Sequence, residues 1–223
     1  MPKSERPGLA GLMRMMVITS RDVERGRGHE DVARAALAAG CRAVQLRDKE
    51  MADRDFAEVA LRIRRACRER GALFLVNDRV DVAYAVQSDG VHLGVEDLDV
   101  TFARRLLPPG FLVGFSPESV PQARAAVRSG ADYLGVGPVF STQSKPDAGR
   151  PIGLDGLSAY CREGLAPVIA VGGIDALNAA GTLTAGAAGA AVVSAVARAV
   201  DMEEAAREVL ESLGEPDHAA GDL

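Results

Sequence analysis

The sequence contains no tryptophan, and aromatic residues make up only 4% of its 223 residues. Its core must therefore be mainly aliphatic, which agrees with an apolar share of 48%. The three cysteines, Cys41, Cys67 and Cys161, form no CxxC pair, which argues against a zinc site or a redox dithiol. A formal net charge of −5 argues against a nucleic-acid binder, whose binding face is usually basic.

The sequence also lacks an apolar run long enough to cross a membrane and a signal-peptide pattern at its start. We therefore expect a soluble, cytoplasmic protein that binds neither membrane nor nucleic acid. The length fits one domain, which we place at residues 12–213. Residues 1–11 and 214–223 are polar and carry Pro and Gly, which is typical of flexible tails.

Eight short apolar segments alternate with longer segments of helical periodicity. The predicted strands are Met15–Thr19, Ala43–Leu46, Leu73–Val76, Gly90–Leu93, Leu112–Gly114, Tyr133–Val136, Val168–Val171 and Ala191–Val193. The clearest predicted helices are Phe56–Arg70, Val120–Ser129 and Ala176–Thr184. Eight repeats of this kind predict a closed (β/α)8 TIM barrel. An open doubly wound sheet is the alternative, although no GxGxxG motif follows the first strand.

Active sites of this fold lie at the carboxyl ends of the strands, so the residues after each strand are the candidates. After the second strand, alternation places Gln45, Arg47 and Lys49 on one side of the chain. A guanidinium binds two phosphate oxygens in a fork, and an ammonium adds a point charge. The segment therefore predicts an anion site, with a solvated basic loop as the alternative.

Carboxylates follow the third and fourth strands. Asp78 stands in Asn77-Asp78-Arg79, and Asp97 ends the segment Gly94-Val95-Glu96-Asp97. Mg2+ favours one or two carboxylates together with waters and phosphate oxygens. We therefore predict that Asp78 and Asp97 hold Mg2+ beside the cationic segment. Capping of a helix N-terminus is the alternative for either residue.

Hydroxyl side chains follow the fifth and sixth strands. Ser116 is predicted to donate to a phosphate oxygen, to cap a helix that begins near Pro117, or both. The polar loop 137–146 is long, and such loops in compact domains are usually functional. Its Thr142 and Ser144 are predicted to hold a small polar ligand, and Lys145 to meet an anion.

Small residues follow the last two strands, with Gly172-Gly173 after the seventh and Val193-Ser194 after the eighth. Small residues expose backbone amides, and phosphate sites at these two loops recur in this fold. The sequence therefore predicts a diphosphate-and-metal half and a monophosphate half that face each other across one barrel mouth.

The histidines do not form an apparent Ser–His–Asp set. His29 is expected just before the first helix, and His218 lies in the C-terminal tail. His92 lies inside the fourth strand, where a satisfied core imidazole is the expected role. Cations and a metal without an obvious general base suit a reaction in which diphosphate leaves.

The sequence resembles the thiamine-phosphate synthase family over about residues 15–209. The similarity lies in several blocks that occur in the expected order, which are Val44-Gln45-Leu46-Arg47-Asp48-Lys49, Asn77-Asp78-Arg79-Val80-Asp81-Val82-Ala83, Asp89-Gly90-Val91-His92-Leu93-Gly94, Gly135-Val136-Gly137-Pro138-Val139-Phe140 with Thr142, Ser144 and Lys145, and Ala170-Val171-Gly172-Gly173-Ile174.

The resemblance implies a transferase that joins 4-amino-5-hydroxymethyl-2-methylpyrimidine diphosphate to 4-methyl-5-(2-phosphooxyethyl)thiazole by a dissociative, Mg-assisted mechanism. It implies that the pyrimidine diphosphate is held by Gln45, Arg47, Lys49, Asn77, Ser116 and Lys145, and that Arg47, Lys49, Ser116 and Lys145 act in catalysis. It implies that Asp78 and Asp97 hold Mg2+. It implies that the thiazole phosphate is held by Thr142, Ser144, Gly173, Val193 and Ser194.

Four residues in three segments depart from the family pattern. Val95 stands where the family usually has Gln, Pro117-Glu118 where it usually has Thr-His or similar, and Ser144 where it usually has Thr. The loss at Val95 puts rate or substrate preference in doubt more than reaction type.

Two other functions remain as alternatives. One is the related thiazole tautomerase, an isomerase on the same barrel, and the other is a non-catalytic binding or regulatory protein of the thiamine pathway. The sequence leaves a homo-oligomer open.

Overall fold

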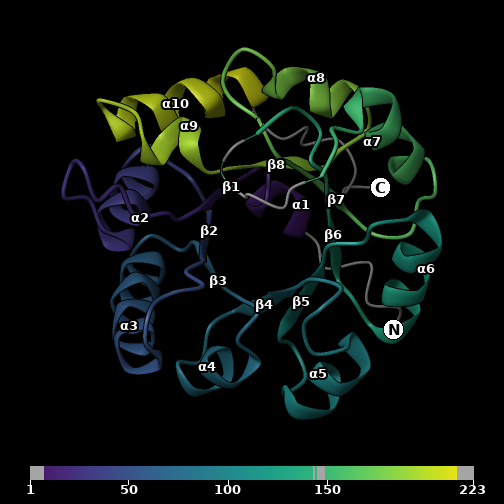
Figure 1. Ribbon diagram of the computed structural model, residues 1–223, viewed down its shortest axis with the longest axis horizontal. Coiled ribbons are helices and arrows are strands. Elements are labelled where there is room, and N and C mark those ends of the chain that lie inside the picture. The colour runs from purple at the N-terminus through teal and green to yellow at the C-terminus, as the bar shows by residue number, and fades with distance from the viewer. Residues whose placement is uncertain (1–7, 143, 145–148, 215–223) are drawn as a thin grey trace, which may run out of the picture.

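The computed structural model describes residues 8–142, 144 and 149–214. Eight parallel strands pair in chain order, and β8 closes on β1 to form a barrel. The TIM barrel predicted from the sequence is therefore confirmed (Figure 1). The strands are β1 (Met15–Ile18), β2 (Ala43–Leu46), β3 (Leu73–Asn77), β4 (Gly90–Leu93), β5 (Leu112–Phe115), β6 (Tyr133–Val136), β7 (Val168–Val171) and β8 (Gly189–Val192).

Helices surround the barrel as an outer ring (Figure 1). They are α2 (His29–Ala38), α3 (Asp53–Glu69), α4 (Val80–Ala85), α5 (Val100–Leu106), α6 (Val120–Ser129), α7 (Gly153–Cys161), α8 (Ala179–Thr184), α9 (Ser194–Ala197) and α10 (Met202–Leu213). A short helix, α1 (Leu9–Leu12), precedes β1, and the domain start expected at residue 12 is its last residue.

The bounds of β2, β4, β6 and β7 are those predicted from the sequence, and the ends of β1, β3, β5 and β8 differ by one or two residues. The largest shift is in β8, which begins at Gly189 rather than Ala191. Glycine is needed at position 189, because a Cβ there would lie only 2.7 Å from the Arg14 carbonyl oxygen. Glycine is uncommon inside strands, and for this reason the sequence pattern did not mark Gly189 as the first residue of β8. The helix α6 was predicted with its exact bounds, and Gly130 ends it in the left-handed conformation with φ of 108°.

The barrel interior is filled by side chains that alternate along each strand. Ala43 and Leu75 point inward and pack with Met16, Ile169 and Ala191, whereas Val44 and Leu46 pack outward against the helices. The same alternation places Gln45 inside the barrel, where it is buried. The inward direction of Gln45 therefore follows from the register of β2, and Arg47 and Lys49, which lie beyond its last residue Leu46, line a cavity at the same end of the barrel.

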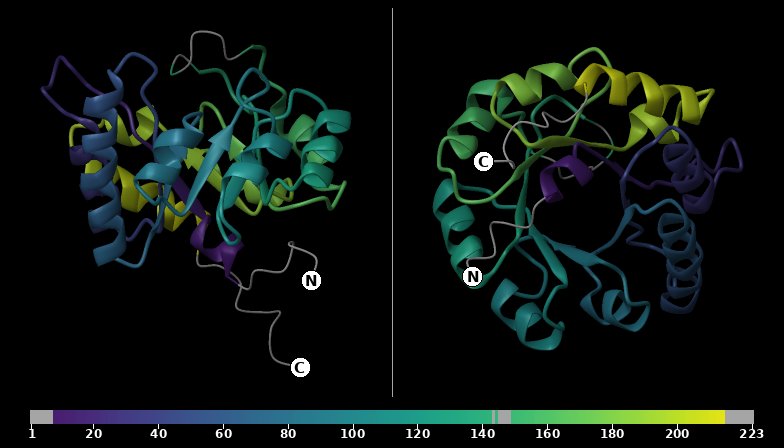
Figure 2. Two further views of the ribbon diagram at one scale, coloured as in Figure 1. Left: turned by 90° about the horizontal axis from the view of Figure 1, so that it is seen from below. Right: turned by 180° about the vertical axis from the view of Figure 1, so that it is seen from behind.

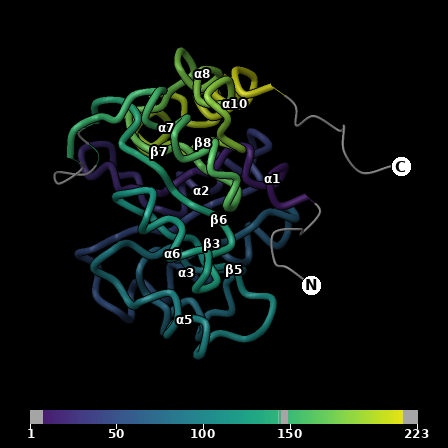
Figure 3. The backbone as a smooth tube through the Cα atoms, turned by 90° about the vertical axis from the view of Figure 1, so that its right-hand side faces the viewer, coloured from purple at the N-terminus to yellow at the C-terminus, as the bar shows by residue number. Residues whose placement is uncertain are grey.

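The two ends of the barrel have different roles. Leu9 and Met13 of the α1 segment pack into the interior cluster and cover the amino ends of the strands. In side view, α1 lies at the end opposite the loop that follows β6 (Figures 2 and 3). The carboxyl ends remain open to a cavity, so ligand access is to that end.

Candidate active site

Two adjoining cavities open at the carboxyl ends of the strands. The larger has a volume of about 470 Å³ and the smaller about 160 Å³. Arg47, Ser116 and Gly135 line both, so the two cavities meet at these residues. The sequence predicted a barrel mouth with two halves, and the structure has two adjoining cavities at that end.

The smaller cavity is lined by the polar residues after β2, β3 and β4. These residues are Gln45, Arg47, Lys49, Asn77, Asp78, His92 and Asp97. The Lys49 ammonium lies 3.5 Å from the Asp78 carboxylate, and 56% of its side chain is exposed to solvent. Among the residues that the structure describes, Arg47 has no carboxylate within 4 Å of its guanidinium. Two cations are thus available for an anion in this cavity.

Asp78 and Asp97 are two carboxylates that line the same cavity. Burial, with the nearby Asp97 carboxylate as the next cause, raises the pKa of Asp78 to about 6, although Lys49 and Arg47 act in the opposite direction. Asp78 also has a φ of 61°, a left-handed conformation that is uncommon for a residue other than glycine. Two oxygen donors that repel each other fit a divalent cation between them.

The alternative role of Asp97 as a helix cap is excluded by the geometry of α5. Asp99 is the N-cap of that helix, and its carboxylate accepts from the Thr101 amide at 2.7 Å. Asp97 instead accepts from the Gly94 amide at 2.6 Å and lines the smaller cavity. In the same way, Ser116 does not cap α6, because Ser119 is the N-cap and accepts from the Gln122 amide.

Ser116 lies at the end of a hydrogen-bonded chain with His92 and Tyr133. The His92 Nε2 atom lies 2.8 Å from the Ser116 hydroxyl, and Nδ1 lies 2.9 Å from the Tyr133 hydroxyl. Burial lowers the pKa of His92 to about 4, so its imidazole is neutral at pH 7. His92 is therefore satisfied, as a core imidazole should be, but it also lines the smaller cavity.

Glycines on β5 and β6 make room for this chain. A Cβ on Gly114 would overlap the Tyr133 ring and lie 2.5 Å from the His92 Nδ1 atom. A Cβ on Gly135 would lie 2.9 Å from His92 and 3.1 Å from the Ser116 hydroxyl. The neighbouring strands thus carry no side chain where the imidazole and phenol enter the barrel.

The larger cavity is lined by small and hydroxyl residues after β6, β7 and β8. The Ser144 hydroxyl donates to the Ser194 hydroxyl at 3.1 Å, and the Ser144 amide donates to the Thr142 hydroxyl at 3.2 Å. Gly173 and Val193 also line this cavity. The predicted site residues of this half are thus close together, while Lys145 lies outside the residues that the structure describes.

Gly173 needs the freedom of glycine. Its φ is 66°, and a Cβ would lie 2.5 Å from the Ser141 carbonyl oxygen. The turn after β7 is therefore held close to the loop after β6, with the Phe140 amide donating to the Gly172 carbonyl at 3.0 Å.

Comparison with known proteins identifies the family. The sequence profile described as thiamine monophosphate synthase matches residues 15–196, from the first residue of β1 into α9. The chain belongs to the thiamine monophosphate synthase family. The family predicted from the sequence is therefore confirmed.

Relatives in this family align over most of their length. The chain is 49% identical over 196 residues to the thiamine-phosphate synthase of Chloroflexus aurantiacus, covering 88% of this chain and 90% of that protein. It is 48% identical over 199 residues to that of Coprothermobacter proteolyticus, covering 89% and 94%. The solved thiamine phosphate pyrophosphorylase of Pyrococcus furiosus has a TM-score of 0.85 at 40% identity, covering 93% of this chain and 98% of that one. These matches confirm the expected transferase and do not favour the isomerase or the binding protein.

Sequence reasoning missed several residues of this thiamine monophosphate synthase family site. Arg150 and Ser20 line the larger cavity, and Tyr133 lines the smaller one. The inward alternation of β4 was a usable signal for His92, but its access to the cavity depends on glycines in neighbouring strands.

Among the described residues, no helix is both long and apolar enough to cross a membrane.

Proposed function

We propose that this chain joins 4-amino-5-hydroxymethyl-2-methylpyrimidine diphosphate to 4-methyl-5-(2-phosphooxyethyl)thiazole, giving thiamine phosphate and diphosphate. The observation that carries the proposal is the pair of adjoining cavities. The smaller has two cations and two neighbouring carboxylates, and the larger is lined mainly by hydroxyl-bearing and small residues. A reaction between a diphosphate ester and a monophosphate-bearing nucleophile needs both environments side by side.

In this proposal the smaller cavity binds the pyrimidine diphosphate. Arg47 and Lys49 hold the diphosphate oxygens, with Lys145 as a further cation, while Gln45, Asn77 and Ser116 orient the substrate through hydrogen bonds. Asp78 and Asp97 would hold Mg2+, which when bound supplies positive charge against the leaving diphosphate. The two side chains fit this role because they are oxygen donors that line one cavity, and the Asp97 carboxylate raises the pKa of Asp78.

The larger cavity binds the thiazole phosphate. Thr142, Ser144 and Ser194 offer hydroxyl donors, and Gly173 and Val193 offer backbone amides. The junction at Ser116 then lies between the two substrates, where the new bond forms.

The reaction proceeds by departure of the diphosphate before bond formation. The methylene carbon–oxygen bond breaks, its electron pair leaves with the diphosphate, and a pyrimidine methylene cation remains. The thiazole nitrogen donates its lone pair to that carbon, and the new carbon–nitrogen bond gives thiamine phosphate. Arg47 and Lys49 stabilise the charge that develops on the leaving group. Binding both partners in one mouth limits capture of the cation by water.

The test is to incubate the purified chain with both substrates and Mg2+, and to follow thiamine phosphate by mass spectrometry and diphosphate by a coupled assay. Equal amounts of both products are expected, with loss of turnover when EDTA is added. An isomerase would release no diphosphate, and a binding protein would retain both ligands without turnover. Either result would overturn the proposal.

A further inference from the structure

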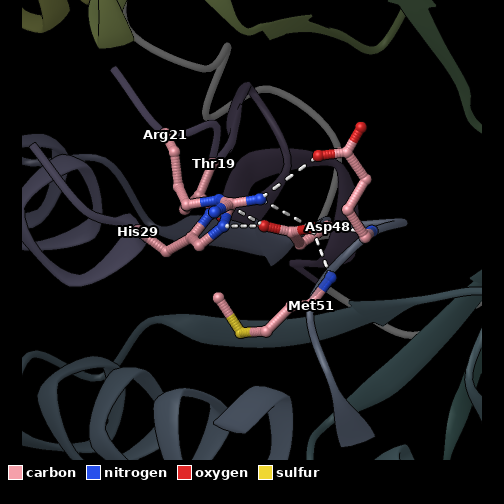
Figure 4. Close-up of polar contacts among 6 residues, drawn as sticks. Thr19, Arg21, His29, Asp48 and Met51 are labelled. Atoms are coloured by element: carbon pink, nitrogen blue, oxygen red, sulfur yellow. Dashed lines mark hydrogen bonds and ion pairs between the residues drawn. The ribbon is translucent and has the colours of Figure 1, made fainter. Parts of the chain in front are cut away.

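A polar cluster lies at the carboxyl ends of β1 and β2, beside the proposed diphosphate cations, and the side chains of its members are buried except for Arg21. It consists of Thr19, Arg21, His29 and Asp48 (Figure 4). Asp48 stands between Arg47 and Lys49 in the sequence, and strand alternation turns its side chain away from the mouth. Its carboxylate is only 6% exposed to solvent. The proposed reaction assigns no role to this cluster.

Every hydrogen-bonding direction of the Asp48 carboxylate has a partner. Oδ2 accepts from the His29 Nε2 atom at 2.9 Å and pairs with the Arg21 Nε atom at 2.7 Å. Oδ1 accepts from the backbone amides of Glu50 and Met51, each at 2.9 Å. The carboxylate therefore fixes the backbone on the far side of Lys49 to side chains from other elements, as Figure 4 shows.

His29 anchors this carboxylate to the barrel wall. It is 3% exposed and is the first residue of α2, and its Nδ1 atom lies 2.8 Å from the Thr19 hydroxyl. Since Asp48 accepts at Nε2, the neutral ring carries its proton there, and the Thr19 hydroxyl donates to Nδ1. Thr19 follows β1 directly and extends its pairing with β2, because its amide donates to the Gln45 carbonyl at 2.8 Å. Three elements thus meet at one carboxylate.

We propose that the Thr19–His29–Asp48 chain, with Arg21, is a positioning device that holds Arg47 and Lys49 in the geometry required to bind the diphosphate of the substrate. The reason is that long cationic side chains on a strand end orient a ligand only if the backbone beneath them is fixed. Misplacement of about 1 Å can cost as much as about 100-fold in rate. This inference rests on the proposed function, because it names the substrate group that the positioned cations bind.

The test is Asp48→Asn, which keeps the size of the side chain and loses the charge that His29 and Arg21 share. The Michaelis constant for the pyrimidine diphosphate is expected to rise about 10-fold and kcat to fall by a similar factor, within the range for misplaced catalytic groups. The Michaelis constant for the thiazole phosphate should stay within about twofold, because Asp48 makes no hydrogen bond to Thr142, Ser144 or Ser194, although Thr19 and Arg47 also line the larger cavity. Asp48→Glu, which restores a carboxylate, is expected to recover part of the loss.

The matched control is Glu203→Gln, which removes one carboxylate from an exposed ion pair with Arg207 on α10, away from the mouth. Its kinetic constants should equal those of the wild type. A folded Asp48→Asn protein with unchanged constants, or with both Michaelis constants raised equally, would overturn the inference. If Asp48→Asn does not fold, Arg21→Gln decides, because Arg21 is 39% exposed. This variant should raise the Michaelis constant for the pyrimidine diphosphate but not that for the thiazole phosphate. An unchanged Michaelis constant for the pyrimidine diphosphate would reject the inference. Failure of the wild type itself to form thiamine phosphate would instead reject the proposed function.

Discussion

The two cavities at the barrel mouth are lined by different kinds of polar group. The smaller has two cationic and two carboxylate side chains, namely Arg47, Lys49, Asp78 and Asp97. The larger is lined mainly by hydroxyl groups and glycine backbone, with Ser144 bonded to Ser194 and Gly173 in a left-handed turn, and the charged residues in its described lining are Arg47, Glu118 and Arg150. In the proposed reaction this difference becomes a division of labour. The smaller, charged half stabilises an anion as it forms, and the larger half only has to hold one that is already formed.

The largest effect is expected where the charged half is weakened. Asp97→Asn should lower kcat/KM by about 100-fold or more, in the range for loss of one electrostatic group. Its fold should remain, because the residue holds a strand end rather than the core. Steady-state kinetics with a Mg2+ titration and a thermal unfolding scan measure both effects.

Asp99→Asn provides the matched control, because Asp99 caps α5 two residues away. Its stability should change by less than about 1 kcal/mol, because Asn caps a helix about as well as Asp, and its activity should be kept. Full activity in Asp97→Asn, together with indifference to EDTA, would contradict the metal assignment.

The larger cavity is tested by Gly173→Ala. The added methyl group would lie 2.5 Å from the Ser141 carbonyl oxygen, so the loop after β6 must shift. The alanine itself would have to adopt a φ of 66°, which is strained for a residue other than glycine. The Michaelis constant for the thiazole phosphate is expected to rise about 10-fold, because displaced donors weaken binding of a fixed anion. Gly149→Ala, with φ of 77° and nothing within 4 Å of the added carbon, separates backbone strain from steric contact. Equal effects of the two variants would show that the contact does not matter.

His92 lies in the lining of the smaller cavity, and its lowered pKa predicts a pH effect on stability. Its folded pKa of about 4 lies below the ordinary value of 6.5, so the unfolded chain binds the proton more readily between these values. The contribution of His92 to the free energy of unfolding is therefore fully present above pH 6.5 and is lost as the pH falls toward 4. From pH 7 to pH 6 the free energy of unfolding should decrease by about 0.5–1 kcal/mol on this account. His92→Gln should reduce that slope in urea unfolding experiments, and an unchanged slope would show that the imidazole is not held neutral.

The smallest effect is expected from Val95→Gln. Val95 is 41% exposed and lines the larger cavity, so an amide there adds at most one weak polar contact. Both kinetic constants should change by less than about threefold, within the range of a single exposed hydrogen bond. Thiamine phosphate should remain the product. A different product from the wild type and the variant would show that the reaction of the wild type has been misassigned.

Much of the fold was predictable from the sequence, because each parallel strand is short, buried and followed by a distinct set of polar residues. The inward direction of Gln45 followed from alternation alone. Cap assignments were harder, since Asp97 and Asp99, or Ser116 and Ser119, are equally good caps by residue type. Only the position at which each helix begins separates them.

Contacts between distant segments were beyond sequence reasoning. The bond between His29 and Asp48 joins residues 19 positions apart, and that between His92 and Tyr133 joins residues 41 positions apart. No local pattern marks either pair, because both depend on the packing of neighbouring barrel units. In contrast, the sequence did indicate that Asp78 and Asp97 lie near each other, since adjacent strands of a barrel bring their ends together.

The division of labour is tested most directly by the ratio of thiamine phosphate to hydroxymethylpyrimidine formed per diphosphate released. Lys49 lines only the smaller cavity and Ser144 only the larger, so their alanine variants separate the two halves. For Lys49→Ala the account predicts a slower reaction at an unchanged ratio, because cation formation is impaired but capture is not. For Ser144→Ala it predicts more hydroxymethylpyrimidine, because water competes for the cation when the thiazole phosphate is held less firmly. Leakage to water in Lys49→Ala together with an unchanged ratio in Ser144→Ala would contradict the account.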